Sequence, residues 1–482
     1  MSTPVRHARP GGSSEATDLD ERGRLALWAA GATTAATFGP YLPYVGLRPE
    51  QVLVYGQLAL CLPFVGLRLR LGHAAIVVIS LLGSILVLAL IGAVVPQGST
   101  MDLTRGSLVA ELDNLATPLA AILLVHIWLT IGANRRQLLH VVASVIVVGA
   151  CVNAVIAFFA TRVDLSPILS SFWEGSQRSL PNEFSLGSVA QNAAALGRQS
   201  GIYNQPAEAG LFYGLAFLGA VYIFSRRPGW LALACSCIVL GGVLSVSKVF
   251  LLVAFPIGAW QLLRVTKGRV KRILAVTFVG LGAAMAAQAG FLSDWAGATF
   301  LNRLLDPREG SVISLYTAGR FGSSGSVSAG FTDILHLSPW FGLGAGRVKL
   351  IYDSGWLEAM VVAGLGGVVL MASVFAVLAR AWLAKRTSGP ASRLGGALIV
   401  LALGAEFGIP AFTANRAGTL LWFLLSLTVL TDQFCSGSIL PSGSEPRLGF
   451  ANDFSGKMRS VAAWRVATNC IHQAEECGVH RG

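Results

Sequence analysis

The sequence predicts an all-α integral membrane protein that crosses the bilayer about twelve times. Residues of the AVILMFWYC group make up 54% of the 482 residues, charged residues make up only 12%, and the mean hydropathy is +0.64. A soluble globular protein has about twice that charged share, near 25%. This composition supplies apolar segments of about 20 residues each, as membrane helices need, and excludes a large soluble domain.

The first group of apolar segments begins the predicted membrane domain, which covers 25–434. These segments occupy 25–47, 51–67, 74–95, 112–132 and 137–160. Pro40 and Pro43 interrupt the first one, and membrane helices tolerate proline where neighbouring groups satisfy the freed carbonyls. Residues 1–24 lack the apolar core and small-residue cleavage site of a signal peptide, so we expect an uncleaved first segment behind a cytoplasmic tail.

A polar stretch at 162–206 separates this group from the next, and a second polar stretch follows at 293–352. The remaining apolar segments are 207–224, 229–246, 248–263 and 273–292 between the stretches, then 353–379, 394–411 and 416–434 after them. The tail at 435–482 is polar, rich in Gly and Ser and without apolar periodicity. We expect this tail to be a disordered cytoplasmic extension.

Basic residues predict the orientation, because Lys and Arg are enriched in cytoplasmic connections. They cluster in every second connection, at Arg22 and Arg24, Arg68 and Arg70, Arg135 and Arg136, Arg226 and Arg227, 264–272 and 380–393. This alternation places both termini in the cytoplasm. It also makes 162–206 and 293–352 two large extracytoplasmic loops.

Each polar stretch contains an arginine among glycines. The first ends in GRQSGIYNQPAEAGLFYGLAF (197–217), which brings Arg198 and Glu208 to the membrane face. Arg198 either snorkels toward water above a capped helix or forms part of an anion site. The second contains TAGRFGSSGSVSAGF (317–331) around Arg320. Gly-rich backbone N–H groups and the arginine fork together suit phosphate oxygens.

Carboxylates occur close to these loops. On a helix, Asp353 and Glu358 lie about 7.5 Å and roughly 140° apart, so they do not form one catalytic pair on a single face. Glu406 falls inside an apolar segment, where lipid exposure is costly. We therefore expect it to face the bundle interior, with Arg416 as its partner across a short turn. No pair of His with a third ligand has metal-binding spacing.

Several motifs together resemble the O-antigen ligase and Wzy-type polysaccharide polymerase superfamily. They are R-x-x-G-I-Y-N-Q-P-A-E (198–208), A-G-R (318–320), S-P-W-F-G-L-G-A-G (338–346) and D-S-G-W-L-E-x-x-x-x-A-G-L-G-G (353–367). The resemblance covers roughly 25–434 and implies a bacterial integral membrane glycosyltransferase with a GT-C-like fold. It implies a polyprenyl-diphosphate-linked glycan as donor, no metal and no cofactor.

The resemblance also implies roles for particular residues. Arg198 and Arg320 look like the two loop arginines that hold the diphosphate leaving group in this family. The ligase branch usually has a His where this chain has Asp353, which leaves Asp353 as a base, a sugar ligand or a helix cap. Arg198, Arg320, Asp353 and Glu208 are therefore the candidate catalytic residues.

The function favoured by these features is polymerisation of polyprenyl-diphosphate-linked oligosaccharide repeat units. The product would be an exopolysaccharide or surface polysaccharide, made at the outer face of the bacterial plasma (inner) membrane. The alternative within the superfamily is an O-antigen-type ligase that transfers a lipid-linked glycan to an acceptor. A transporter or flippase of a lipid-linked or anionic solute is the alternative from another class, and the chain lacks the matching halves of many transporters. A non-catalytic component of an export complex is a further alternative.

The expected partners follow from the favoured function. They are the lipid-linked glycan, membrane lipids, and a chain-length regulator and flippase of the same pathway. The net charge of +12 is explained by the distribution of Lys and Arg across the membrane, so we expect no nucleic acid partner.

Overall fold

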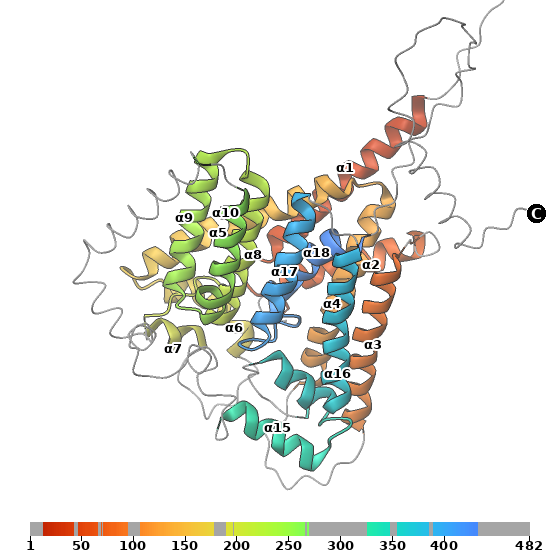
Figure 1. Ribbon diagram of the computed structural model, residues 1–482, viewed down its shortest axis with the longest axis vertical. Coiled ribbons are helices and arrows are strands. Elements are labelled where there is room, and N and C mark those ends of the chain that lie inside the picture. Colours follow the sequence, from red (N-terminus) through yellow and green to blue (C-terminus); the bar gives the residue numbers. More distant parts are fainter. Residues whose placement is uncertain are drawn as a thin grey trace, which may run out of the picture. The chain divides into compact units, whose positions relative to one another are not determined.

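Helices occupy every predicted apolar segment that the structure describes (Figure 1). The computed structural model describes residues 13–42, 47–65, 69, 71–94, 107–177, 189–195, 197–265, 268, 325–347, 354–384 and 389–431. Every regular element within these ranges is a helix. The predicted segment 273–292 and the tail 435–482 lie outside the described residues.

The first helices follow the predicted segments closely, apart from the start of the first. They are α1 (Ser13–Ala36), α2 (Pro49–Val65), α3 (His73–Val94), α4 (Leu108–Ile131) and α5 (Arg135–Ala160). Helix α1 begins well ahead of the expected residue 25 and ends before Pro40. Proline has no N–H to continue the helical ladder, so the segment 25–47 does not form one continuous helix.

The polar stretches contain short helices, and apolar helices follow each of them. The first holds α6 (Ser166–Gln177) and α7 (Val189–Ala195), followed by α8 (Pro206–Phe224), α9 (Pro228–Leu244), the π-helix η3 (Val249–Ala254) and α10 (Phe255–Val265). The second holds α15 (Ser326–Leu337), followed by α16 (Gly355–Ala384), α17 (Pro390–Ala405), α18 (Asn415–Leu425) and the π-helix η4 (Ser426–Leu430). Proline occupies the start of α8, α9 and α17, where its missing N–H costs nothing.

Five helices are long and apolar enough to cross a membrane: α3, α4, α5, α8 and α16. Shorter apolar helices accompany them at 228–244, 249–264, 390–405 and 416–430. A membrane helix needs about 20 mostly apolar residues, a length that these five helices meet. The chain is therefore an α-helical membrane protein.

Local sequence signals explain the sharp turn between α4 and α5. Gly132 closes α4 in the left-handed conformation, with φ of 118°, and its N–H bonds to carbonyls of the last turn. The Asn134 side chain then caps α5 by accepting a hydrogen bond from the N–H of Arg136 at 2.9 Å. Gly and Asn are the residues that favour these two positions.

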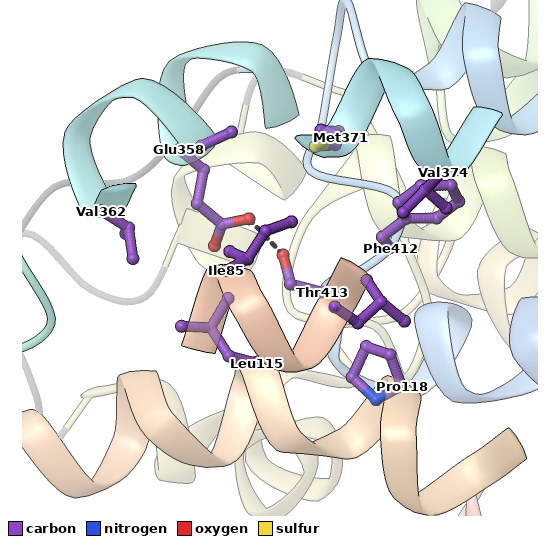
Figure 2. A pocket seen from close by; sticks show the side chains of 11 residues that line it. Ile85, Leu115, Pro118, Glu358, Val362, Met371, Val374, Phe412 and Thr413 are labelled. Atoms are coloured by element: carbon purple, nitrogen blue, oxygen red, sulfur yellow. Dashed lines mark hydrogen bonds between the residues drawn. The ribbon is translucent and has the colours of Figure 1, made fainter. Parts of the chain in front are cut away.

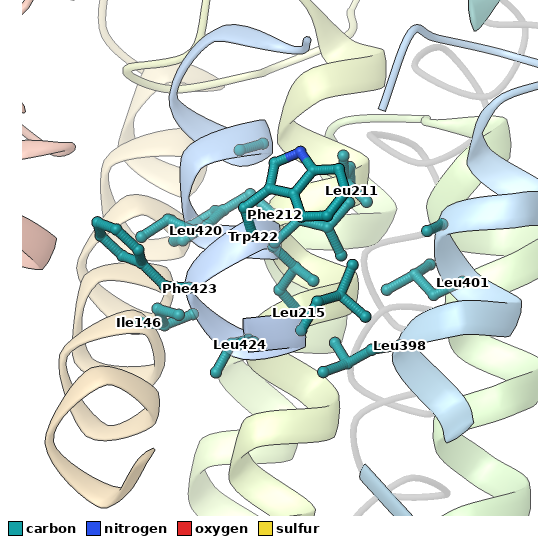
Figure 3. Packing of buried hydrophobic residues seen from close by; sticks show 14 of the residues in the cluster. Ile146, Leu211, Phe212, Leu215, Leu398, Leu401, Leu420, Trp422, Phe423 and Leu424 are labelled. Atoms are coloured by element: carbon teal, nitrogen blue, oxygen red, sulfur yellow. The ribbon is translucent and has the colours of Figure 1, made fainter. Parts of the chain in front are cut away.

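The apolar core surrounds α18. Trp422, Phe423 and Leu424 are fully buried, and Figure 3 shows their side chains among residues of α5, α8 and α17. The ring of Phe423 lies 5.4 Å from that of Trp128 on α4. Arg135, at the start of α5, contacts η4. Its Nε donates to the carbonyl of Leu427 at 2.6 Å and its Nη2 to that of Thr428 at 3.1 Å.

Helix α16 is broken at Gly364, whose φ of 63° and ψ of −156° lie outside the helical region. A segment that we call the glycine loop, residues 338–347, packs into this break. The N–H of Leu365 donates to Pro339 O at 2.8 Å, and Val361 O accepts from the N–H of Leu343 at 2.6 Å. The glycine loop thus replaces the intrahelical hydrogen bond that the break removes.

The glycine loop also contacts α3 and α4. The N–H of Ala345 donates to Ala89 O at 3.0 Å, and the N–H of Gly346 donates to the Glu111 carboxylate at 2.6 Å. A Cβ atom on Gly344 would lie 2.0 Å from the backbone nitrogen of Ala93, so only glycine permits this approach. These contacts fix the first part of α16 against α3 and α4.

Candidate functional site

Helix ends from distant parts of the chain meet where α8, α16 and α18 begin and α17 ends, a region that we call the loop end. The turn 406–414, between α17 and α18, joins them. Its Glu406 carbonyl accepts hydrogen bonds from Gly355 N–H at 2.9 Å and from the Ser354 hydroxyl at 2.8 Å. Arg416, just after the turn, is bonded to Glu208 of α8. The loop end therefore unites residues of two of the sequence motifs.

The first motif forms a segment that we call the anchor segment, residues 197–205, and Asn153 of α5 holds its centre. The Asn153 side chain accepts from the N–H of Ile202 at 2.9 Å and donates to Ser200 O at 3.3 Å and to the Tyr213 hydroxyl at 2.9 Å. Trp173 of α6 donates to Gly201 O at 3.1 Å. Because these partners are buried, the anchor segment is held by the core and not by solvent.

Strained backbone lies beside the anchor segment. The N–H of Gln199, next to Arg198, donates to Leu244 O at the end of α9 at 2.9 Å. Val246, two residues after that end, is buried and has φ of 46°. A β-branched residue with positive φ is a genuine outlier, and such strain concentrates at functional sites. The π-helix η3 follows immediately, after Lys248.

Glu208 is almost completely buried, with 1% of its surface exposed, and it lies at the start of α18. Its Oε1 accepts a hydrogen bond from the N–H of Arg416 at 3.2 Å. Helix α18 has no side-chain cap of its own, so Glu208 acts as a cap supplied by α8. A carboxylate at this position also meets the positive end of the helix dipole.

The Arg416 side chain is also buried and has unused hydrogen-bonding capacity. Its Nη1 donates to Ile202 O at 3.1 Å, and its guanidinium carbon lies 5.0 Å from the centre of the Tyr41 ring. Its Nε and Nη2 are buried and make no hydrogen bond within the described residues. The same holds for the Tyr203 hydroxyl and Asn204 Oδ1 of the anchor segment. Unsatisfied buried groups of this kind require an explanation such as a water or a ligand.

Tyr41 adds a hydrogen-bond donor to this group. Its hydroxyl accepts from the Asn204 side chain at 2.7 Å, which leaves its own proton available. Burial raises the pKa of Tyr41, with the positive charge of Arg416 opposing the shift, so the hydroxyl stays protonated at neutral pH. Tyr41 and Arg416 can therefore both donate to one acceptor, such as an anion.

A second buried arginine lies close to this group. Arg48 is 3% exposed, and its Nε and Nη2 each lie 3.5 Å from a carboxylate oxygen, of Glu50 and Asp113 respectively. Tyr55 donates to the same Asp113 at 2.8 Å. The charge of Arg48 also acts on Glu208. We call Arg48, Glu50, Glu208 and Arg416 the buried charge cluster.

The structure locates two of the four sequence-predicted site residues. Arg198 lies at the start of the anchor segment, where it is half-buried and its N–H donates to Ala193 O at 2.9 Å, and Glu208 follows the segment in α8. Arg320 and Asp353 lie outside the described residues. Glu406 faces the interior as expected, with none of its surface exposed.

The expected pairing of Glu406 with Arg416 is wrong. Glu406 Oε1 accepts from the N–H of Phe412 at 3.0 Å, whereas Arg416 is bonded to Glu208 and Ile202. Sequence reasoning missed the buried state of Arg416 and Arg48. The only sequence signal was that Arg48 and Arg416 each stand at the edge of an apolar segment. An arginine in that position is equally typical of a residue that snorkels toward water.

Comparisons with known proteins leave the family of this chain open, because no family model and no curated protein matches it. Within the described residues, no group of three or more His, Cys, Asp or Glu side chains is arranged to hold a metal ion. The arginines and tyrosines of the loop end are instead suited to binding an anion.

Proposed function

We propose that the protein is a glycosyltransferase that polymerises polyprenyl-diphosphate-linked oligosaccharide repeat units at the outer face of a bacterial plasma membrane. In this reaction an acceptor sugar hydroxyl attacks the anomeric carbon of the donor. The bond from that carbon to the diphosphate breaks, and the diphosphate leaves with the electron pair. The enzyme must bind a diphosphate whose negative charge increases in the transition state.

The observation that carries the proposal is the set of unsatisfied donors around the anchor segment. Arg416 offers Nε and Nη2, the Tyr203 hydroxyl makes no hydrogen bond within the described residues, and the charge of Arg416 acts on both Tyr203 and Tyr41. Donors placed before the reaction stabilise developing oxyanion charge without reorganisation. Arg198 joins them from the start of the anchor segment, and Arg320 is proposed to join them from the second loop.

The rigidity of the anchor segment also supports the proposal. Asn153, Trp173 and Arg416 hold its backbone from three different helices. A catalytic group must be held within a fraction of an ångström of its working position, and supporting hydrogen bonds provide this. The motif pattern fits polymerase better than ligase, because Asp353 occupies the position at which the ligase branch usually has His.

The test is polymer formation by the purified protein in liposomes, with a lipid-linked repeat unit as the only substrate. Arg198→Lys and Arg320→Lys each keep the charge but lose the two-point fork, so we expect each to lose at least 90% of the activity, a tenfold effect of about 1.4 kcal/mol. The double change to Ala should be scarcely worse than the worse single change, because residues that act as a unit are not additive.

Arg227→Lys is the matched control, because Arg227 is exposed and lies in the connection between α8 and α9, at the opposite end of α8 from Glu208. It should retain wild-type activity. Near-normal polymer formation by both lysine variants at equal protein levels would contradict the assignment of the two arginines. Absence of any polymer from the wild-type protein would contradict the proposed function itself.

A further inference from the structure

A cavity at the loop end contains a carboxylate that the proposed function does not yet use. It lies between α3, α4, α16 and the turn 406–414, and its cavity volume is about 30 Å³, room for about two water molecules or one hydroxyl group. Apolar side chains form most of its wall, among them Leu82, Ile85 and Leu115. Glu358 is the one charged residue in the lining that the structure describes.

Glu358 is held in place from the other side of the cavity. The Thr413 hydroxyl donates to its Oε2 at 2.5 Å, and Figure 2 shows the two side chains pointing toward each other. Thr413 also lines the cavity, so the carboxylate and the hydroxyl form its polar side. This contact occupies Oε2 and leaves Oε1 to accept a further donor, because a carboxylate has two acceptor oxygens.

The backbone around Glu358 is fixed by contacts that no ordinary helix start requires. Glu358 lies between the Gly355 N–H, bonded to Glu406 O, and the break at Gly364, which the glycine loop fills. The Glu358 N–H donates to Ser354 O at 3.0 Å. A carboxylate on so constrained a turn has a defined direction, as a group that contacts a reacting atom needs.

The cavity and the buried charge cluster are connected through one short stretch of chain. Thr413 contacts Glu358, and Arg416, one helical turn further along the sequence, contacts Glu208 and the anchor segment. The proposed diphosphate site at Arg416 and the cavity at Thr413 are therefore formed by residues three positions apart in the chain. Other charges facing Glu358 are those of Glu111 on α4 and Glu406 in the turn.

We propose that this cavity receives the acceptor hydroxyl and that Glu358 is the catalytic base that takes its proton. The inference rests on the proposed function and adds the acceptor site to it. As the hydroxyl oxygen bonds to the anomeric carbon, the bond from that carbon to the diphosphate oxygen breaks. The electron pair leaves with the diphosphate, and the hydroxyl proton moves to Glu358 Oε1. The acceptor class is a sugar alcohol group at the growing end of a lipid-linked glycan.

The apolar wall has a specific role in this arrangement. Water competes with the acceptor as a nucleophile, and its attack would hydrolyse the donor without extending the glycan. Leucine, isoleucine and valine side chains around the carboxylate exclude water, whereas the C–H face of a sugar tolerates them. Phe412, also in the wall, is 4% exposed and its ring stacks on that of Phe375 at 4.7 Å between centroids, so it adds a fixed apolar surface to the wall.

The experiment compares Glu358→Gln with the wild-type protein in the liposome assay, at saturating lipid-linked repeat unit. Glutamine keeps the shape and can still accept from Thr413, but it cannot take a proton. We expect kcat to fall at least 100-fold, the lower range for loss of a general base, with donor affinity unchanged. Glu21→Gln is the matched control, because it removes an exposed carboxylate on α1 that does not line the cavity. This control should keep its activity within threefold.

The outcomes separate the inference from the proposed function. If the wild type polymerises and Arg198→Lys is impaired while Glu358→Gln stays within threefold of wild type, the acceptor site is wrong and the proposed function survives. If the wild type forms no polymer, both fail.

A chemical test covers the case in which Glu358→Gln does not accumulate in the membrane. The apolar reagent dicyclohexylcarbodiimide adds to carboxyl groups in apolar surroundings, and peptide mass spectrometry locates the adduct. We expect adduct formation at Glu358 to parallel the loss of polymerisation in the unaltered protein. Full activity after complete labelling, or no labelling at Glu358, would overturn the proposal.

Discussion

Replacing Gly364 by Ala tests the broken helix on which the loop end depends. The φ of 63° and ψ of −156° at Gly364 belong to a region that is essentially restricted to glycine. A Cβ atom there would also lie 2.6 Å from the carbonyl carbon of Trp340 and 2.7 Å from the backbone nitrogen of Gly342. Both neighbours are backbone atoms of the glycine loop, so neither can move aside as a flexible side chain would.

The expected cost follows from these two effects. The disallowed backbone conformation costs about 1 to 3 kcal/mol, and forcing an extra carbon into packed structure costs about 1 to 3 kcal/mol more. We therefore expect Gly364→Ala to lower the free energy of unfolding by about 3 kcal/mol or more. In a regular helix the same substitution would have the opposite sign, with a gain of about 1 kcal/mol.

Gly83 provides the matched control, because it lies within α3 and a Cβ atom there would meet nothing within 4 Å. The assay is thermal unfolding of the purified protein in detergent, followed by tryptophan fluorescence and by the fraction that remains monodisperse. Gly364→Ala should unfold at a clearly lower temperature, whereas Gly83→Ala should match or exceed the wild type. Equal stability of Gly364→Ala and wild type would show that Gly364 is not in a non-helical conformation and that the glycine loop does not pack against it.

Two further predictions concern the supports of the site and of the core. Asn153→Leu removes the hydrogen bonds to Ile202 and Tyr213 and leaves buried groups unsatisfied. We therefore expect the free energy of unfolding to fall by about 3 kcal/mol in the thermal assay, with faster protease cleavage within the anchor segment. Unchanged cleavage would contradict this role of Asn153. Arg135→Gln removes the guanidinium that bonds the η4 carbonyls and should cost about 2 kcal/mol, whereas exposed Arg136→Gln should cost almost nothing. Equal stability of these two arginine variants would show that the η4 carbonyls do not need Arg135.

The positions of the helices could be predicted from the sequence because hydrophobicity over a membrane length is a local property. Composition and apolar runs alone located the apolar helices that the structure describes, including α8 and α16, but not α6, α7 and α15 in the polar stretches. Local signals also account for several helix ends, such as the left-handed Gly132 and the capping Asn134 between α4 and α5. Arg198 and Glu208 were identified as candidates because a Gly/Asn/Pro turn leads directly into an apolar helix.

The partners of the polar residues were decided only by the tertiary structure. Glu406 and Arg416 are ten residues apart and carry opposite charges, yet the Arg416 guanidinium donates to Ile202 O and the Arg416 backbone N–H to Glu208, both in the other half of the chain. The break at Gly364 likewise follows from the glycine loop that fills it, because glycine within an apolar run is compatible with an unbroken helix. Burial of an apolar segment depends on its own composition, whereas a buried charge or a broken helix is stabilised by whichever distant groups the fold brings to it.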